Sequence, residues 1–467
     1  MQNGKIFIYK IQEYFLYLLI FLLPWQTRWM FKLGELNGGY WEYATMSLYG
    51  VDILLVGLLA YWLIVKLLNC LIARLDSARQ VKLLSNKIWL LIGGLELFIF
   101  ISIFFAPDKW LAFYGYGRFL LGVGLFFLLM QVYPVKYSQS EFNWVKYDKI
   151  KLYWTIVASG FLQSILAIQQ LMMQKVYGSK WLGMASQSPE ILGVSVVETE
   201  LRRWLRAYGS LPHPNILGGF LAVCLLINII LYFDLHKKLM GATSATANKY
   251  KIGILVSISF FIINFIGLLL TFSRSAWLGF AVGTIIFLIS GFFTYKRKEA
   301  FINAFKLIFI IIIISSIFLW LFREPATNRF VISNRLENKS VQERIDYNQD
   351  ALQIIKNNSW FGTGIKNYGL AIHRDINAER TVYEYQPVHN TFLLVWAETG
   401  IFGLLFFVSL LVYTLVNLLK QKSYGKMSLI CVMIIMMFFD HWWWSMPFGI
   451  VLFWLVIGIA FKNTNAN

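Results

Sequence analysis

Two arginines, two histidines and an aspartate are the residues of this chain best suited to chemistry. They lie in separate segments of an otherwise apolar sequence, at Arg206, His213, Arg274, His389 and Asp440. A guanidinium group binds phosphate through paired hydrogen bonds, and an imidazole exchanges a proton near neutral pH. If the fold brings these side chains together, they suit an anionic substrate and a reaction that needs a general base.

Arg274 lies in a tight turn between two apolar runs, within Thr-Phe-Ser-Arg-Ser-Ala-Trp at 271–277. A cation at this depth is costly unless it is paired or functional, so we expect an anion as its partner. The alternative is a side chain that reaches out to lipid phosphates.

Arg206 and His213 share the segment Arg-Ala-Tyr-Gly-Ser-Leu-Pro-His-Pro-Asn at 206–215. Two further arginines precede it, so a solvated basic loop is the alternative to a substrate site. The prolines on either side of His213 fix an extended backbone, which favours a structural role for this histidine over a catalytic one.

His389 and Asn390 open a long apolar run, and Glu398 follows about two and a half helical turns deeper. An interfacial imidazole can act as a general base, although a lone histidine at a helix start also serves as a cap. A carboxylate within a membrane helix is a candidate substrate ligand or a structural hydrogen-bond partner. Asp440 either orients a base, binds an acceptor or anchors a hairpin, and the three tryptophans at 442–444 are typical of an interfacial belt.

The composition predicts that the scaffold for these residues is a membrane protein. Hydrophobic residues make up 58% of the 467 positions and charged residues only 14%, too few for a water-soluble surface. The apolar residues form blocks long enough to cross a bilayer as helices. We therefore expect an all-α integral membrane protein, one polytopic domain over 1–467 with about twelve transmembrane helices. The predicted spans are Phe7 to Leu23, Leu48 to Leu68, Ile88 to Ala106, Phe119 to Tyr133, Leu152 to Met173, Ile216 to Phe233, Ile252 to Phe272, Ala276 to Phe293, Leu307 to Phe322, Thr391 to Leu419, Met427 to Phe439 and Phe448 to Phe461.

The distribution of lysine and arginine predicts the sidedness. Basic clusters such as Lys296-Arg297-Lys298 lie between spans on the side shared by both termini, so both termini are expected in the cytoplasm. The first span lacks a signal-peptide cleavage pattern and is expected to stay in the mature chain. The formal charge of +18 is spread between the spans, so nucleic acid is not an expected partner, whereas membrane lipids are.

Two long connections then face the outside, at 174–212 and 323–388, and are expected to form an outer polar region. In the second, Ser-Val-Gln-Glu at 340–343 has the form of a capping box. We expect an amphipathic helix that starts there and ends before Gly362. This helix either takes part in the site or is a solvated lid without a chemical role. Its apolar residues at helical spacing are Val341, Ile345, Leu352 and Ile355.

Three segments resemble the O-antigen ligase and polymerase superfamily, the bacterial membrane glycosyltransferases that include O-antigen ligases, Wzy-type polymerases and related protein oligosaccharyltransferases. The segments are 206–215, Ser-Arg-Ser-Ala-Trp-Leu-Gly at 273–279, and His389-Asn390 followed by Glu398-Thr-Gly400. The resemblance runs from about the sixth span to the tenth and includes Trp-Phe-Gly-Thr-Gly at 360–364.

This resemblance implies a donor glycan carried on undecaprenyl diphosphate and transferred to an acceptor hydroxyl with inversion, without a metal or other cofactor. His389 would activate the acceptor, while Arg206 and Arg274 would hold the diphosphate and stabilise charge as it leaves. The implied location is the bacterial inner membrane, with the site facing the periplasm or cell exterior. Further residues predicted to bind substrate are His213, Asn390, Glu398 and Asp440.

The acceptor is open between another lipid-linked glycan, a lipid A core and a protein. The modest loop at 323–388, which shows no added soluble domain, favours a polymerase over a ligase. A transporter or flippase of lipid-linked oligosaccharide is the alternative from another class. Transporter folds usually show internal repeats and polar sites at the bilayer midplane, and this sequence shows neither pattern. The three cysteines lie in or beside the spans and suggest no disulfide framework or zinc site.

Overall fold

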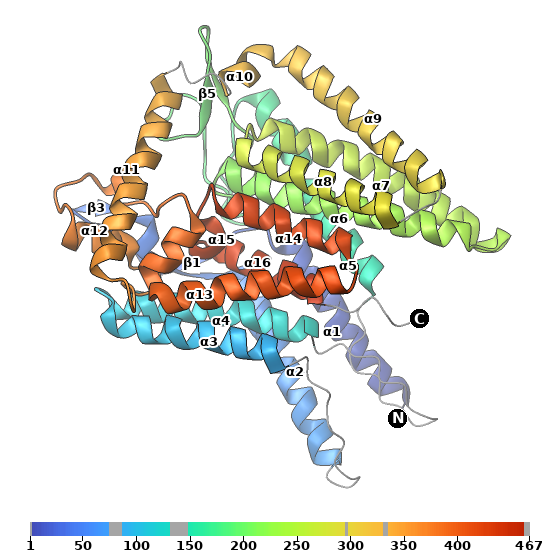
Figure 1. Ribbon diagram of the computed structural model, residues 1–467, viewed down its shortest axis with the longest axis horizontal. Helices are drawn as coiled ribbons and strands as arrows, with labels where there is room; N and C mark the ends of the chain where they lie inside the picture. Colours follow the sequence, from blue (N-terminus) through green and yellow to red (C-terminus); the bar gives the residue numbers. More distant parts are fainter. Residues whose placement is uncertain (1, 74–85, 131–147, 295–297, 330–334, 462–467) are drawn as a thin grey trace.

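The computed structural model describes residues 2–73, 86–130, 148–294, 298–329 and 335–461, which are mostly helical (Figure 1). Within these ranges eight helices are long and apolar enough to cross a membrane, so the predicted class of helical membrane protein is confirmed. They are α2 (Gly50–Ala73), α3 (Asn86–Ser102), α4 (Lys109–Met130), α5 (Lys149–Met173), α6 (Pro214–Met240), α7 (Ser244–Leu270), α9 (Lys298–Leu321) and α13 (Thr391–Lys420).

Other apolar helices are α1 (Gln2–Leu22), α8 (Arg274–Thr294), α14 (Tyr424–Met437) and α16 (Pro447–Phe461). Each predicted span overlaps one helix of these two sets, whereas the number of crossings and the side of each terminus stay predictions. Several helices extend beyond the predicted spans, and α4 begins at Lys109, well before the predicted start at Phe119. The cause is local, because the Asp108 side chain accepts a hydrogen bond from the Leu111 backbone N–H at the start of the helix.

The polar elements gather at one end of the helical body, away from both marked termini (Figure 1). This polar end comprises short strands and the helices α10 (Arg323–Asn328), α11 (Arg335–Asn357) and α12 (Tyr368–Asp375). The strands form three two-stranded antiparallel sheets, a departure from the all-α prediction. They are β1 (Arg28–Lys32) with β4 (Met46–Tyr49), β2 (Glu35–Leu36) with β3 (Gly39–Tyr40), and β5 (Val196–Glu198) with β6 (Arg203–Leu205).

The amphipathic helix expected in the 323–388 segment is α11, but its start and its buried face differ from the prediction. It begins at Arg335, so the Ser-Val-Gln-Glu at 340–343 lies inside the helix and is not a capping box. Ile345 and Leu352 are 45% and 55% exposed. The helix does end before Gly362, at Asn357, as expected. The buried face carries Tyr347, Ala351, Ile354 and Ile355.

The core is built around α6, which packs against α5, α7, α8 and α14 and is almost wholly buried. Small residues allow this close packing. A Cβ at Gly219 would lie 2.4 Å from the Trp442 ring.

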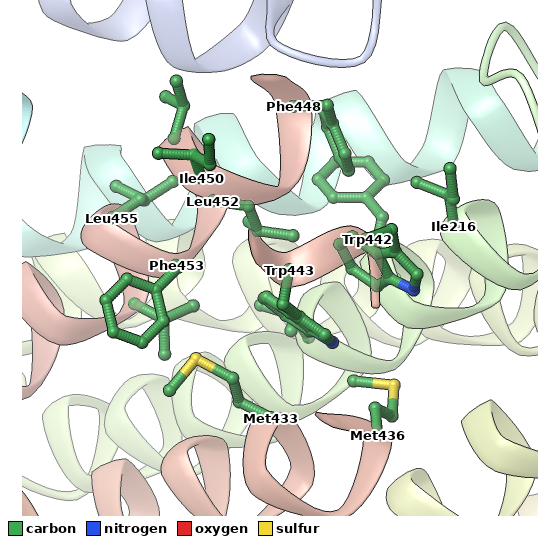
Figure 2. Packing of buried hydrophobic residues seen from close by; sticks show 14 of the residues in the cluster. Ile216, Met433, Met436, Trp442, Trp443, Phe448, Ile450, Leu452, Phe453 and Leu455 are labelled. Atoms are coloured by element: carbon green, nitrogen blue, oxygen red, sulfur yellow. The ribbon is translucent and has the colours of Figure 1, made fainter. Parts of the chain in front are cut away.

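Trp442, Trp443 and Trp444 lie in this core, on the short α15 (Trp442–Ser445), and are only 2–3% exposed. Figure 2 shows Trp442 and Trp443 with Met433, Met436 and Phe448 around them. The predicted interfacial belt is therefore wrong: three bulky rings fill the space between helices, because burial of aromatic area outweighs their affinity for the interface.

The helix α13 is broken at Gly400, where φ is 74° and ψ is −179°. The segment 359–364, here called the clip, inserts at this break. The Thr363 and Gly364 N–H groups donate to the carbonyls of Ala397 and Glu398, both at 2.9 Å, and the Ile401 N–H donates to Ser359 O at 2.8 Å. Non-helical backbone at this depth requires such internal hydrogen bonds, since lipid offers none. Two of the sequence motifs, 360–364 and 398–400, thus interlock.

Candidate active site

His389 lies just before α13, and Asn390 is the N-cap of that helix. The imidazole is flanked by two rings: the His441 ring centroid is 5.2 Å away and that of Tyr347, on α11, is 6.1 Å away. Its side chain keeps 25% of its surface exposed, and its Nδ1 lies 3.6 Å from Asp440 Oδ1. A histidine that is both oriented and accessible is suited to general-base work.

Asp440 is buried and is held from several sides. Its Oδ1 accepts from the His441 backbone N–H at 2.9 Å, and its Oδ2 accepts from Asn215 Nδ2 at 3.0 Å. Its backbone carbonyl accepts from Thr391 Oγ1 at 2.7 Å, which ties it to the start of α13. Burial opposes its ionisation, but the neighbouring His389, His441 and His213 outweigh burial and hold the pKa of Asp440 below its usual value. A fixed negative charge therefore stands beside His389.

Arg206 reaches the same cluster through Asn215. Its Nε donates to Thr271 O at 2.8 Å and its Nη2 donates to Asn215 Oδ1 at 2.6 Å. A continuous polar chain thus runs from Arg206 through Asn215 and Asp440 to His389. Burial, with the positive charge of Arg329, lowers the pKa of Arg206 well below its usual value. A bound anion would stabilise the charged form of the Arg206 guanidinium.

Arg274 begins α8 and has the anionic partner that the sequence led us to expect. Its Nη2 lies 3.0 Å from Glu337 Oε2 on α11, and its Nη1 donates to Arg329 O at 2.9 Å. Arg329 also pairs with Glu337 and donates from Nε to Phe272 O at 3.1 Å. One carboxylate therefore pairs with two guanidinium groups at the junction of α8 and α11, and the trio keeps a net positive charge.

His213 and His441 are buried members of the cluster. His213 caps α6 by accepting from the Asn215 backbone N–H at Nδ1, and its Nε2 lies 2.8 Å from Ser195 Oγ. Burial, together with Arg206, lowers the pKa of His213 to about 3, so it is neutral, which agrees with a structural role. His441 Nδ1 lies 2.6 Å from Ser445 Oγ, and burial lowers its pKa to about 3.

Two predicted substrate ligands are already engaged by the protein. The Asn390 side chain caps α13 by accepting from the N–H groups of Phe392 and Leu393. Glu398 Oε2 accepts from Trp444 Nε1 at 2.7 Å. Glu398 also lines a small pocket, together with Trp41, Tyr43, Lys366, Tyr368, Gly369, Pro387 and Ser445.

Sequence reasoning missed several residues of the site. His441 could have been found, because it is adjacent to Asp440. Arg344 lies in the predicted amphipathic helix, whereas Glu337 precedes its predicted start and belongs to α11 only because that helix begins at Arg335. Tyr43, whose ring centroid is 6.0 Å from that of His441, comes from the first connection between spans, which carried no motif.

Among the residues that the structure describes, one group could hold a metal ion, namely His389, Asp440 and His441. One ligand atom of each residue lies within 4.8 Å of those of the other two. Two imidazoles and a carboxylate suit Zn²⁺. However, hydrogen bonds to Asn215 and Ser445 already orient Asp440 and His441. Chelation and added Zn²⁺ would show whether this group binds a metal.

The fold and the site define a multi-pass helical membrane protein in which loops from distant segments assemble a cluster of arginines, histidines and one aspartate. Residues 259–408 match the family model described as O-antigen ligase. The predicted resemblance to the O-antigen ligase and Wzy-type superfamily is thereby confirmed, and it indicates a membrane ligase or polymerase that transfers glycans. The match includes Arg274 and His389, whereas Arg206 and Asp440 lie outside it. No curated protein and no solved structure matches the chain significantly.

Proposed function

We propose that this protein moves a glycan from undecaprenyl diphosphate to an acceptor hydroxyl, with inversion and without a metal. The observation that carries the proposal is the polar chain from Arg206 through Asn215 and Asp440 to His389. It joins a buried cation, which an anion would stabilise, to an accessible imidazole held beside a carboxylate.

In the proposed reaction Arg206 and Arg274 bind the diphosphate. The acceptor oxygen attacks the anomeric carbon of the donor sugar while the bond from that carbon to the diphosphate oxygen breaks. The acceptor proton passes to His389, and the electron pair of the broken bond leaves with the diphosphate. Asp440 stabilises the imidazolium that forms, as in other base–carboxylate pairs. A single displacement inverts the configuration.

The proposal includes about twelve crossings, cytoplasmic termini and a site at the outer face of the bacterial inner membrane. The segments 174–212 and 323–388 would then be the two larger outer loops. Contacts between them support a shared polar surface: the Glu200 N–H donates to Glu324 Oε1 at 2.9 Å, and Asn328 Nδ2 donates to Glu198 O at 2.9 Å. Cysteine labelling of intact cells at 200 and at 339 tests this, and labelling only after lysis would contradict it.

The test of activity uses purified protein in nanodiscs with a glycan on undecaprenyl diphosphate. His389→Ala and Arg274→Ala are each expected to reduce transfer by about a thousandfold. His373→Ala and Arg374→Ala are matched controls on α12, because they remove the same side-chain types from a helix outside the cluster. Undiminished transfer by both site variants would contradict the proposed mechanism.

The products distinguish polymerase from ligase, and we propose the polymerase. A ladder of repeat units on lipid is expected, whereas a single transfer to a lipid A core or a protein would mean a ligase. The same vesicles also test the flippase alternative. Movement of the lipid-linked glycan across the bilayer without any transfer would favour it.

A further inference from the structure

The inward face of α11 links the two ends of the site. Glu337 pairs with Arg274 near the start of the helix, and the Tyr347 ring lies beside that of His389 ten residues later. Residues three and seven apart lie on the same face of a helix. Arg344 is seven residues after Glu337 and three before Tyr347, so it lies on this face between them. At about 1.5 Å per residue, Arg344 lies roughly 10 Å from Glu337 and 4.5 Å from Tyr347 along the axis.

The surroundings of Arg344 agree with this placement. It is partly buried, and burial lowers its pKa, with Asp440 acting in the opposite direction and Arg274 in the same direction. Charges from both ends of the site therefore act on this guanidinium.

Arg344 also lacks the partners that the other arginines of the site have. Arg206, Arg274 and Arg329 each donate to a backbone carbonyl, and the last two pair with Glu337. Within the part of the chain that the structure describes, Arg344 has neither a hydrogen bond nor an ion pair. A half-buried guanidinium with unused donors is an unfavourable arrangement unless an anion completes it.

We propose that Arg344 is a third donor-binding cation, which contacts the diphosphate between Arg274 and His389. This inference rests on the proposed function, and it adds a residue that positions the scissile end of the donor near the base. Two arginines held rigidly by backbone carbonyls would fix the diphosphate, and Arg344 on α11 would close over it.

The test is the affinity for undecaprenyl diphosphate, measured by titration of the full-length protein in phosphatidylcholine nanodiscs. Arg344→Ala is expected to weaken binding at least tenfold, and Arg344→Lys to restore part of the loss, since an ammonium keeps the charge but not the paired hydrogen bonds. The control is Lys339→Ala, which removes an exposed cation from the same helix, where it pairs with Glu343 at i,i+4.

A second arm separates specific binding from general attraction of anionic lipid. Repeating the titration in phosphatidylglycerol nanodiscs should leave the loss in Arg344→Ala unchanged if the cation meets the donor. If the loss disappears there, Arg344 only attracts membrane anions and the inference is overturned. The melting temperature provides the structural readout, because a purely structural role would lower it without changing affinity for the donor.

The outcomes distinguish this inference from the proposed function. If Arg344→Ala binds as tightly as wild type while Arg274→Ala binds weakly, Arg344 is not a donor ligand and the proposed function stands. If Arg206→Ala, Arg274→Ala and Arg344→Ala all bind like wild type, the diphosphate site itself is wrong.

Discussion

The substitution Asp440→Asn tests whether the buried carboxylate acts on His389. It preserves the volume of the side chain but removes its charge. When His389 takes the acceptor proton, an imidazolium stands 3.6 Å from the carboxylate. With an effective dielectric constant of about 20, Coulomb's law gives roughly 4–5 kcal/mol for that pair. At about 1.4 kcal/mol per tenfold, kcat should fall about a thousandfold.

The same substitution has a separate cost in stability. Asp440 accepts from the His441 N–H with one oxygen and from Asn215 with the other. An asparagine has one acceptor and one donor end, so one of these two donors is left without an acceptor whichever way the amide turns. A loss of about 1–3 kcal/mol in unfolding free energy is expected. Melting temperatures of the purified variant must therefore accompany the kinetics.

The assay is the initial rate of transfer by purified protein, with Asp440→Asn alone and on a His389→Ala background. If Asp440 works through His389, the second substitution adds almost nothing once the base is gone. A kcat within threefold of wild type for folded Asp440→Asn would refute the reasoning. So would a full thousandfold loss on top of His389→Ala, because Asp440 would then act elsewhere.

Three further outcomes are expected. Gly400→Ala should destabilise the protein by roughly 2–4 kcal/mol, since its Cβ would lie 2.0 Å from Trp360 O, whereas Gly57→Ala, which meets no atom within 4 Å, should be neutral in the same thermal melt. Acidification from pH 7 to pH 5 should lower the free energy of unfolding, because His213 and His441 have pKa values of about 3 in the folded protein and take up protons only on unfolding. Each histidine accounts for a loss of about 2 kcal/mol over this range. His441→Gln should therefore flatten the dependence of melting temperature on pH. Chelation by EDTA should leave transfer unchanged and added Zn²⁺ should inhibit it through His389, Asp440 and His441, whereas a loss with EDTA that Zn²⁺ restores would show a metal enzyme instead.

The sequence was sufficient for the helices and for most of the polar cluster. Apolar blocks of membrane length predicted the helices, because lipid imposes a single kind of secondary structure on a spanning segment. The three motifs predicted most of the polar cluster. The interlocked clip could not be predicted in this way: Gly362 and Gly400 are visible in the sequence, but nothing local indicates that they meet.

The errors share a physical cause, which is that the choice of face depends on the partner. Ile345 and Leu352 satisfied a helical pattern, yet α11 turns Glu337, Arg344 and Tyr347 inward because Arg274 and His389 lie there. The tryptophans at 442–444 satisfied the pattern of a membrane interface, yet they fill a core in which Trp442 lies next to Gly219 of α6. The type of a side chain indicates which solvent it prefers, but it does not indicate which neighbours the fold will place beside it.

The break at Gly400 also constrains how the protein is made. The carbonyls of Ala397 and Glu398 and the N–H of Ile401 bond to the clip, so a broken α13 alone in hydrocarbon would lose these three hydrogen bonds, and each buried polar group left without a partner costs several kcal/mol. Since the clip precedes α13 in the chain, it is synthesised first. The helix must therefore enter the bilayer either straight, and bend when the clip docks, or together with the clip. Substitutions in 359–364 should accordingly show as failed biogenesis and rapid proteolysis in the cell.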